Sequence, residues 1–368
     1  MKNAFIILCA TLSLTFTYAA KAQSPAKEAM NAFAHFTKNQ DVKQLETARK
    51  HVDEAYKTAK DSTSQKNNLI RALVYSALAV VDSSRNFSYK KDPLDEASYA
   101  LKQLDDAKFY NEHEPEIEFI KDQLAKAYLF EATSALNYSN FEDAANAFAK
   151  VDTLAPEDMH ISHNLAVLNE RLGYPRKAIM YYKRLIEKEP APAYYFNLSE
   201  LYNLTGNDDL ALKSLEQGRK HFPEYKDLVF KELNYYADKQ DYENVIRLLP
   251  LSLKLDEYSI PLNYLAGFSY DITGNISKAE EHYEKVLNID PNNYEGNYAL
   301  GLLYLNSYVK NQGKKQLIYT ALNYLSKANE IDPYQLKTLQ SLAILYQYSG
   351  DEIRLQRVNN KINQLKLN

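Results

Sequence analysis

Residues 260–293 read IPLNYLAGFSYDITGNISKAEEHYEKVLNIDPNN, and this stretch decides the fold. Apolar residues recur at helical spacing on both sides of Gly274, and Asp290-Pro291 closes the stretch. Glycine adopts the left-handed backbone of a tight turn at little cost, whereas a proline inside a helix costs roughly 3 kcal/mol. The stretch therefore predicts two antiparallel helices that are joined at Gly274 and end before Pro291.

The same punctuation recurs along the chain with a single period. Four kinds of residue repeat at intervals of 33 or 34 residues, or at twice that interval where one copy is missing. In each series, the interval that spans residues 305–320 is longer by the same 8 residues. The four series are Pro156, Pro190, Pro223, Pro291 and Pro333; Gly173, Gly206, Gly274 and Gly350; Tyr202, Tyr236, Tyr270, Tyr304 and Tyr346; and the small residues Ala144, Ala178, Ala211, Val245, Ala279 and Ala321. Their agreement predicts an array of repeated helical hairpins.

Residues 260–293 resemble a tetratricopeptide repeat in the spacing of their small, aromatic and proline residues. The residues that carry the resemblance are Gly267, Tyr270, Gly274, Ala279, Tyr283 and Pro291. The resemblance extends over residues 125–368 and implies an all-α, right-handed superhelical solenoid of antiparallel helix hairpins. The seven expected units are 125–158, 159–191, 192–225, 226–259, 260–293, 294–335 and 336–368.

The chain departs from the family pattern in several places. The early tryptophan of the family is missing, because the chain contains no tryptophan. In unit 226–259, Gln240 and Val245 stand where glycine and alanine are expected. Extra residues around 308–317 predict a longer or kinked hairpin in unit 294–335.

Residues 23–124 lack the clean repeat but keep helical periodicity. We expect helices near 26–38, 41–60, 65–82 and 94–109, with Asp92 as the N-cap of the last one and Pro93 at its first position. Residues 83–92 have no apolar run and are expected to form a loop. Two interpretations stay open, namely divergent hairpins of the same array or a separate helical domain.

Residues 1–22 have the pattern of a secretory signal peptide. Lys2 supplies a positive charge, Ala4 to Ala20 form a short apolar stretch, and Ala20 and Ala22 occupy the small-residue positions before a cleavage point. We therefore expect export to the periplasm or exterior of a Gram-negative-type bacterium, with cleavage after Ala22. A retained N-terminal anchor is the alternative.

Composition narrows the choice of partners. The chain has 44 Lys and Arg against 48 Asp and Glu, a net charge of −4, and no basic block. Nucleic acid and anionic membrane surfaces are therefore not expected partners. The single cysteine lies within the expected signal peptide, so we expect neither a disulfide nor a thiolate zinc site in the mature chain.

The resemblance also predicts a binding surface, because the first helices of this family line a concave groove that holds peptide segments. The expected groove residues are His163, Phe196, Glu200, Asn203, Phe230, Asn234, Tyr264, Phe268, Asp271 and Tyr298. Four aromatic residues among them, at positions 196, 230, 264 and 298, recur at steps of 34. Exposed rows of large aromatic residues are uncommon unless a partner covers them. Coverage of the row by the superhelix itself, or by the N-terminal helices, is the alternative.

The sequence offers no support for catalysis. His160 and His163 are spaced to share a metal, but no third ligand of matching spacing lies nearby. The sequence contains no glycine-rich phosphate loop, nucleophile elbow or His-Glu-x-x-His motif, so we expect neither an enzyme nor a cofactor. The preferred hypothesis is an exported scaffold that binds a protein or peptide through its groove. The alternative is a self-associating structural subunit of an envelope or secretion assembly.

Overall fold

The computed structural model describes residues 24–310 and 314–367 of the chain. Within these ranges the regular structure consists of helices, and no strand occurs, which confirms the expected all-α class. The chain divides into two compact units, Met1–Pro190 and Ala191–Asn368, which are described separately. The expected signal peptide, residues 1–22, lies outside the described residues.

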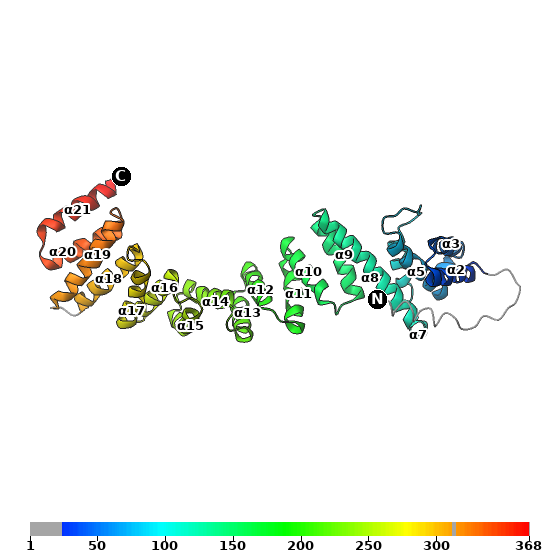
Figure 1. Cartoon of the computed structure of the whole chain (residues 1–368), viewed down its shortest axis with the longest axis horizontal. Helices are drawn as coiled ribbons and strands as arrows, with labels where there is room; N and C mark the ends of the chain where they lie inside the picture. The colour runs from blue at the N-terminus through cyan, green and yellow to red at the C-terminus, as the bar shows by residue number, and fades with distance from the viewer. Residues whose placement is uncertain (1–23, 311–313, 368) are drawn as a thin grey trace. The chain divides into compact units, whose positions relative to one another are not determined.

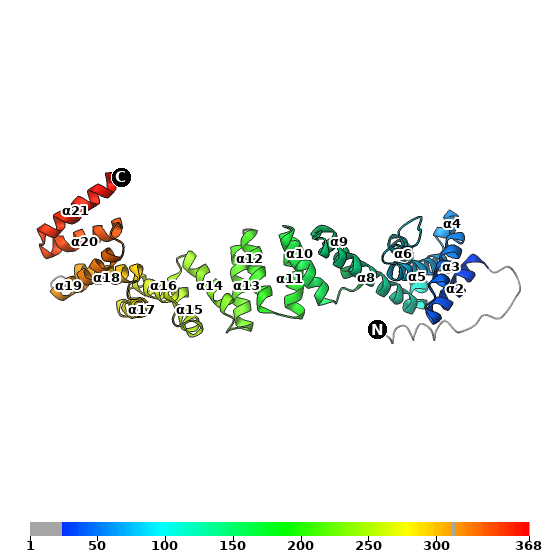
Figure 2. The same ribbon diagram turned by 45° about the horizontal axis from the view of Figure 1, so that its top comes forward.

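The second unit is a series of helix hairpins in which consecutive helices pack side by side (Figures 1 and 2). Its helices are α12 (Pro192–Leu204), α13 (Asp208–His221), α14 (Lys226–Asp238), α15 (Tyr242–Leu255), α16 (Ile260–Ile272), α17 (Ile276–Ile289), α18 (Tyr294–Lys310), α19 (Lys315–Ile331), α20 (Leu336–Ser349) and α21 (Glu352–Leu367). The first helices of these hairpins begin at residues 192, 226, 260, 294 and 336, which are the first residues of the sequence-derived units.

The extra residues of unit 294–335 lengthen both of its helices. Helices α18 and α19 have 17 residues each, whereas α16 and α17 have 13 and 14. The insertion is thus absorbed as about one additional helical turn on each side of the link, and the hairpin stays paired.

Small residues let the two helices of a hairpin approach closely. Ala211, Val245 and Ala279 are completely buried, as the sequence predicts for a helix crossing. Gly267 serves the same purpose, since a Cβ placed on it would lie 2.6 Å from the ring of Tyr283. The Tyr283 ring, itself 1% exposed, fills the space that Gly267 leaves open.

The links between helices use the left-handed backbone conformation that the sequence predicts for glycine. Gly206 and Gly274 have φ angles of +74° and +84°. Gln240 occupies the corresponding place in its hairpin and adopts a φ of 58°. The turn geometry is therefore retained where the glycine is missing, at the conformational cost of a residue that has a Cβ.

The first unit contains shorter and less regular helices before its own hairpins. Its helices are α2 (Pro25–Asn39), α3 (Val42–Glu54), α4 (Ala59–Ser62), α5 (Gln65–Val81), α6 (Pro93–Lys102), α7 (Ala107–Glu112), α8 (Glu114–Asn137), α9 (Phe141–Leu154), α10 (Met159–Arg171) and α11 (Pro175–Lys188). Asp92 caps α6 and accepts a hydrogen bond from the N–H of Leu94, and Pro93 is the first residue of the helix, as expected. Residues 83–92 lie outside the helices, which agrees with the expected loop.

Two expected helices of the first unit are each broken. The helix expected at 41–60 ends at Glu54, because Thr58 and Asp61 form a capping box that starts α4 anew. The helix expected at 94–109 ends at Lys102, and Asp106 caps a separate helix α7. In both places a local side-chain cap competes with continuation of the helix.

The boundary expected between residues 124 and 125 falls inside α8. This helix has 24 residues and runs without a break from Glu114 to Asn137. It packs against α5 and α6 on one side and against α9 on the other, so it belongs to both the N-terminal helices and the first expected repeat. The chain has no linker at that position.

Candidate protein-binding surface

The predicted aromatic row lies on four successive first helices of the second unit. Phe196, Phe230, Tyr264 and Tyr298 are each the fifth residue of their helix, on α12, α14, α16 and α18. First helices touch across the hairpins, α12 with α14 and α16 with α18. All four rings are partly buried. Each ring therefore has one part fixed in the protein and another part in contact with solvent.

Three of these four rings pack on the hydrophobic core. Phe230 and Tyr264 pack against the cluster of buried residues formed by α14 to α18, and Tyr298 packs against the next cluster. The ring of Tyr264 lies 5.7 Å from that of Tyr283. Burial raises the pKa of Tyr264, and the nearby Glu295 carboxylate adds to this shift. These three rings are thus held by the core, which lowers the entropic cost of ordering them on binding.

Lysine side chains from neighbouring positions lie over the row. The Nζ atom of Lys231 lies 5.9 Å from the Phe196 ring and 2.6 Å from the Glu200 carboxylate. The Nζ atom of Lys337 lies 4.7 Å from the Tyr298 ring. These cation–π contacts place positive charge along an otherwise aromatic surface.

The other predicted residues of the second unit have different environments. Asn234 is exposed and Asn203 is partly buried. Phe268 packs edge-to-face against Tyr242 at 5.4 Å, so its ring is also anchored. Burial raises the pKa of the Asp271 carboxyl, against the opposing effect of Lys310. The Asp271 carboxylate forms no hydrogen bond or ion pair with the described residues, which leaves it available to a polar group of a partner.

The structure adds a second set of apolar residues that the sequence analysis missed. The set consists of the residues that lie two positions before the turn glycines of α12, α16 and α20. They are Leu204, which is 74% exposed, Ile272, which is 58% exposed, and Tyr348, which is 50% exposed. Each is the thirteenth residue of its helix, and the thirteenth residues of α14 and α18 are the polar Asp238 and Asn306. The shared spacing from the glycines is a sequence signal, but it does not reveal exposure.

The predicted groove residue His163 belongs to the first unit, whereas the aromatic row belongs to the second. It is exposed on α10, as is His160 one turn earlier. Among the described residues, no group of three or more His, Cys, Asp or Glu side chains has the geometry of a metal site. The same residues include no helix long and apolar enough to cross a membrane.

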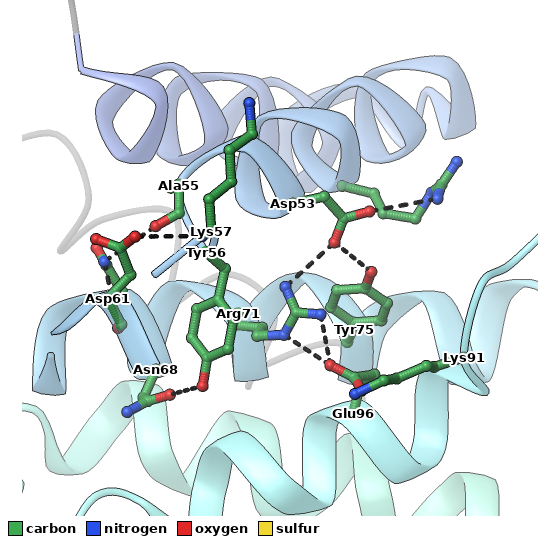
Figure 3. A network of polar contacts seen from close by, with 12 residues as sticks. Asp53, Ala55, Tyr56, Lys57, Asp61, Asn68, Arg71, Tyr75, Lys91 and Glu96 are labelled. Carbon is green, nitrogen blue, oxygen red and sulfur yellow. Dashed lines mark hydrogen bonds and ion pairs between the residues drawn. The ribbon is translucent and has the colours of Figure 1, made fainter. Parts of the chain in front are cut away.

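The first unit contains a group of charged side chains centred on the buried Arg71 (Figure 3). The guanidinium of Arg71 donates to Glu96 through Nε at 2.8 Å and to Asp53 through Nη1 at 3.1 Å. Tyr75 donates to the same Asp53 oxygen at 2.7 Å, and Lys91 contacts Glu96 at 3.0 Å. Because Arg71, Tyr75 and Glu96 are all buried, a substrate could not reach them. The group instead joins α3, α5 and α6.

Comparison with known proteins identifies the repeat. The sequence profile of the tetratricopeptide repeat family matches residues 260–293. Residues 260–293 form a tetratricopeptide repeat. No curated protein sequence matches the chain.

Three solved structures are similar to this chain, and one of them has a TM-score that supports a shared fold. The C-terminal part of a TPR repeat-containing protein from Cytophaga hutchinsonii is 17% identical and superposes with a TM-score of 0.50, over 65% of this chain and 95% of that one. YrrB, described as a TPR protein with an unusual peptide-binding site, is 22% identical with a TM-score of 0.43, over 54% and 98% of the two chains. MamA from Desulfovibrio magneticus is 18% identical with a TM-score of 0.38, over 49% and 97%. At 17% identity the likeness to the Cytophaga hutchinsonii structure concerns the fold alone.

Proposed function

We propose that this tetratricopeptide repeat chain is an exported, non-catalytic scaffold that holds a segment of a partner protein on the first helices of its second unit. The observation that carries the proposal is the row of four partly buried rings at one register position, three of which, Phe230, Tyr264 and Tyr298, pack on the core. Anchored aromatic residues supply contact area at a low entropic cost, as in other protein interfaces. The exposed Leu204 and Ile272 extend the apolar area at the ends of two of these helices.

The magnitude of the apolar contribution sets the expected affinity. Covering about half of four rings would bury on the order of 300–400 Å², worth roughly 8–10 kcal/mol at about 25 cal/mol per Å². Association and ordering cost on the order of 4–15 kcal/mol. The row alone therefore supports binding in the micromolar range or weaker, and Asp271 and Asn234 are the polar groups best placed to add specificity.

Export is part of the proposal and rests on the first 22 residues. Their charge, apolar stretch and Ala20-Lys21-Ala22 ending have the order of a cleavable signal peptide. Mass determination of the protein purified from its native cell tests this point. A mature chain that starts at Gln23 supports export, and an intact chain that starts at Met1 contradicts it.

Binding is best tested at residues whose loss leaves the core unchanged. Phe230 and Tyr264 contact the core, so their removal would also destabilise the fold. Leu204→Ser combined with Ile272→Ser removes only exposed side chains, and Tyr258→Ser, at a 76% exposed residue of the link before α16, is the matched control. In proximity labelling in the native cell, the double variant should lose neighbours that the control variant keeps, with an unchanged melting temperature. Identical neighbours for all three proteins would count against this surface.

Self-association is the second candidate, favoured by the last hairpin. Ile344 and Ile353 are 45% and 69% exposed there, beside the half-exposed Tyr348. Light scattering of the purified protein separates the two candidates. A monomer at micromolar concentration supports the scaffold, whereas a dimer that Ile353→Ser dissociates supports self-association.

A further inference from the structure

The first unit contains a cavity of about 680 Å³ between the loop 83–92 and helices α8 and α9. The cavity is open to solvent and is bordered by a long loop, whereas the regular hairpins have only a short turn between their helices. The link between α12 and α13 has three residues, whereas Asp82 to Asp92 separate α5 from α6. Helix α6 reaches α8 at Tyr128, where Ser98 and Tyr128 share a 2.6 Å hydrogen bond. Further along α8, toward Tyr138, the loop 83–92 and not a helix lies across the cavity from α8.

The loop is held in one conformation by the carboxylate of Asp82. This buried carboxylate accepts hydrogen bonds from the N–H of Asn86 at 2.7 Å, the N–H of Phe87 at 2.9 Å and the hydroxyl of Tyr89 at 2.8 Å. These bonds lower the pKa of Asp82 against the effect of burial. The border of the cavity is therefore built before any ligand arrives.

Arg85 completes this border. Its backbone adopts a left-handed φ of 56°, a conformation that a residue with a Cβ keeps only when its surroundings impose it. Its guanidinium donates to Asp92 at 2.6 Å and to the carbonyl oxygens of Ala79 and Asp82 at 3.3 and 3.0 Å. Because Asp92 neutralises it, Arg85 brings no unpaired positive charge into the cavity.

The opposite wall carries an unpaired carboxylate beside two exposed rings. Phe130 and Glu131 line the cavity from α8 and Tyr138 from the C-cap of that helix, and the two rings are 52% and 84% exposed. Glu131 forms no hydrogen bond or ion pair with the described residues. Burial raises the pKa of its carboxyl, although Lys150 acts in the opposite direction. The Lys150 ammonium itself lies over the Tyr128 ring at 4.7 Å.

We propose that this cavity binds a primary ammonium or guanidinium group carried on an aliphatic chain, with Glu131 as its counter-ion and Phe130 and Tyr138 as its aromatic walls. A carboxylate beside aromatic faces is the combination that attracts organic cations in proteins. The volume suits a lysine or arginine side chain with the adjoining backbone, or a free aliphatic amine. The site lies in the first unit, so it is a second binding function beside the proposed scaffold surface.

The experiment compares two labelled Gly/Ser peptides by fluorescence anisotropy with the full-length protein. One has a single central lysine and the other has norleucine, which keeps the aliphatic chain and lacks the charge. The lysine peptide should bind about tenfold more tightly, the ratio expected when a charge-assisted contact joins a cation–π contact. Glu131→Gln should abolish this ratio, and Tyr138→Ala should reduce it about threefold. Glu187→Gln, an equal loss of charge at an exposed position on α11, should leave it unchanged.

Competition with n-pentylamine separates the two sources of the cation. Displacement of the lysine peptide at equal concentrations shows that a free amine suffices, and failure to displace it shows that the site takes a polypeptide segment. Equal binding of the lysine and norleucine peptides would overturn the proposal, as would a lysine preference that survives Glu131→Gln in a variant with wild-type melting. Leu204→Ser with Ile272→Ser should not affect the ratio, so failure of this site and failure of the scaffold surface are distinguishable.

Discussion

Arg219 on α13 holds the completely buried carboxylate of Glu232 on α14 through two hydrogen bonds. Its Nε donates to Oε2 at 2.6 Å and its Nη2 donates to Oε1 at 3.2 Å. The hydrogen bond from Arg219 to Glu232 raises the pKa of the guanidinium. On the same helix α14, the Tyr236 hydroxyl donates to Glu216 of α13 at 3.0 Å. Consecutive hairpins are thus joined by specific polar contacts as well as by apolar packing.

Replacement of Arg219 by Met should strongly destabilise the second unit. The substitution leaves the buried Glu232 carboxylate without its counter-ion, which costs about 3–5 kcal/mol in buried pairs. Urea denaturation followed by circular dichroism measures the loss. The double variant Arg219→Met with Glu232→Leu should recover most of it, because an apolar pair removes the uncompensated charge.

Lys254→Met is the matched control for that experiment. It breaks the ion pair with Glu224, in which the side chains are 68% and 74% exposed. Exposed pairs contribute at most about 1 kcal/mol, so this variant should unfold nearly as the wild type does. Equal effects of Lys254→Met and Arg219→Met would show that the buried pair has no special importance.

Replacement of Gln240 by Gly should stabilise the hairpin of α14 and α15. Gln240 adopts a φ of 58°, in the region where a residue with a Cβ is strained by about 1–2 kcal/mol. Part of this gain is offset by the greater freedom of glycine in the unfolded chain, which leaves a net stabilisation of about 0.5–1 kcal/mol. Thermal melting should show a higher transition temperature.

The reverse substitution in the neighbouring hairpin provides the comparison. Gly206 has the same left-handed backbone, and a Cβ placed there would meet no atom within 4 Å. Gly206→Ala should therefore destabilise through backbone conformation alone, by about 1 kcal/mol. A neutral result at both positions would mean that the links relax without strain.

Replacement of Glu96 by Gln should make the free energy of unfolding less sensitive to a fall in pH. Burial raises the pKa of Glu96, but hydrogen bonds from Arg71 and Lys91 outweigh it and bring the pKa below the ordinary 4.5. A carboxyl with a lowered folded-state pKa stabilises the fold above its unfolded pKa, and this contribution is lost as the pH falls through the folded value. The unfolding free energy should therefore decrease below about pH 4.5, and less steeply in Glu96→Gln.

The same variant should also be less stable at neutral pH, because Arg71 loses its closest charged partner. Denaturation curves between pH 3 and pH 7 test both effects. Glu187→Gln, at an exposed position, is the control and should follow the wild-type curve. If Glu96→Gln keeps the full acid sensitivity, then other carboxylates cause it.

The repeat, its period and the hairpin turns could be predicted from the sequence because they depend on local chemistry. A glycine favours the left-handed link, a proline ends a helix, and an alanine permits a close crossing, each within a few residues of its own position. The register of Phe196, Phe230, Tyr264 and Tyr298 follows from the same period, and the structure places all four on first helices. The broken helices near residues 55 and 105 escaped prediction, because short caps at Thr58 and Asp106 competed with helical periodicity.

Only the tertiary structure decided which side chains are buried and which of them meet. The partial burial of the four rings depends on cores formed by several hairpins, and the exposure of Leu204 and Ile272 depends on what the neighbouring helices leave uncovered. The cavity beside Glu131 arises because a loop borders α8 where a helix would otherwise pack. Local propensity acts over a few residues, whereas burial and pairing are set by contacts between residues far apart in the chain.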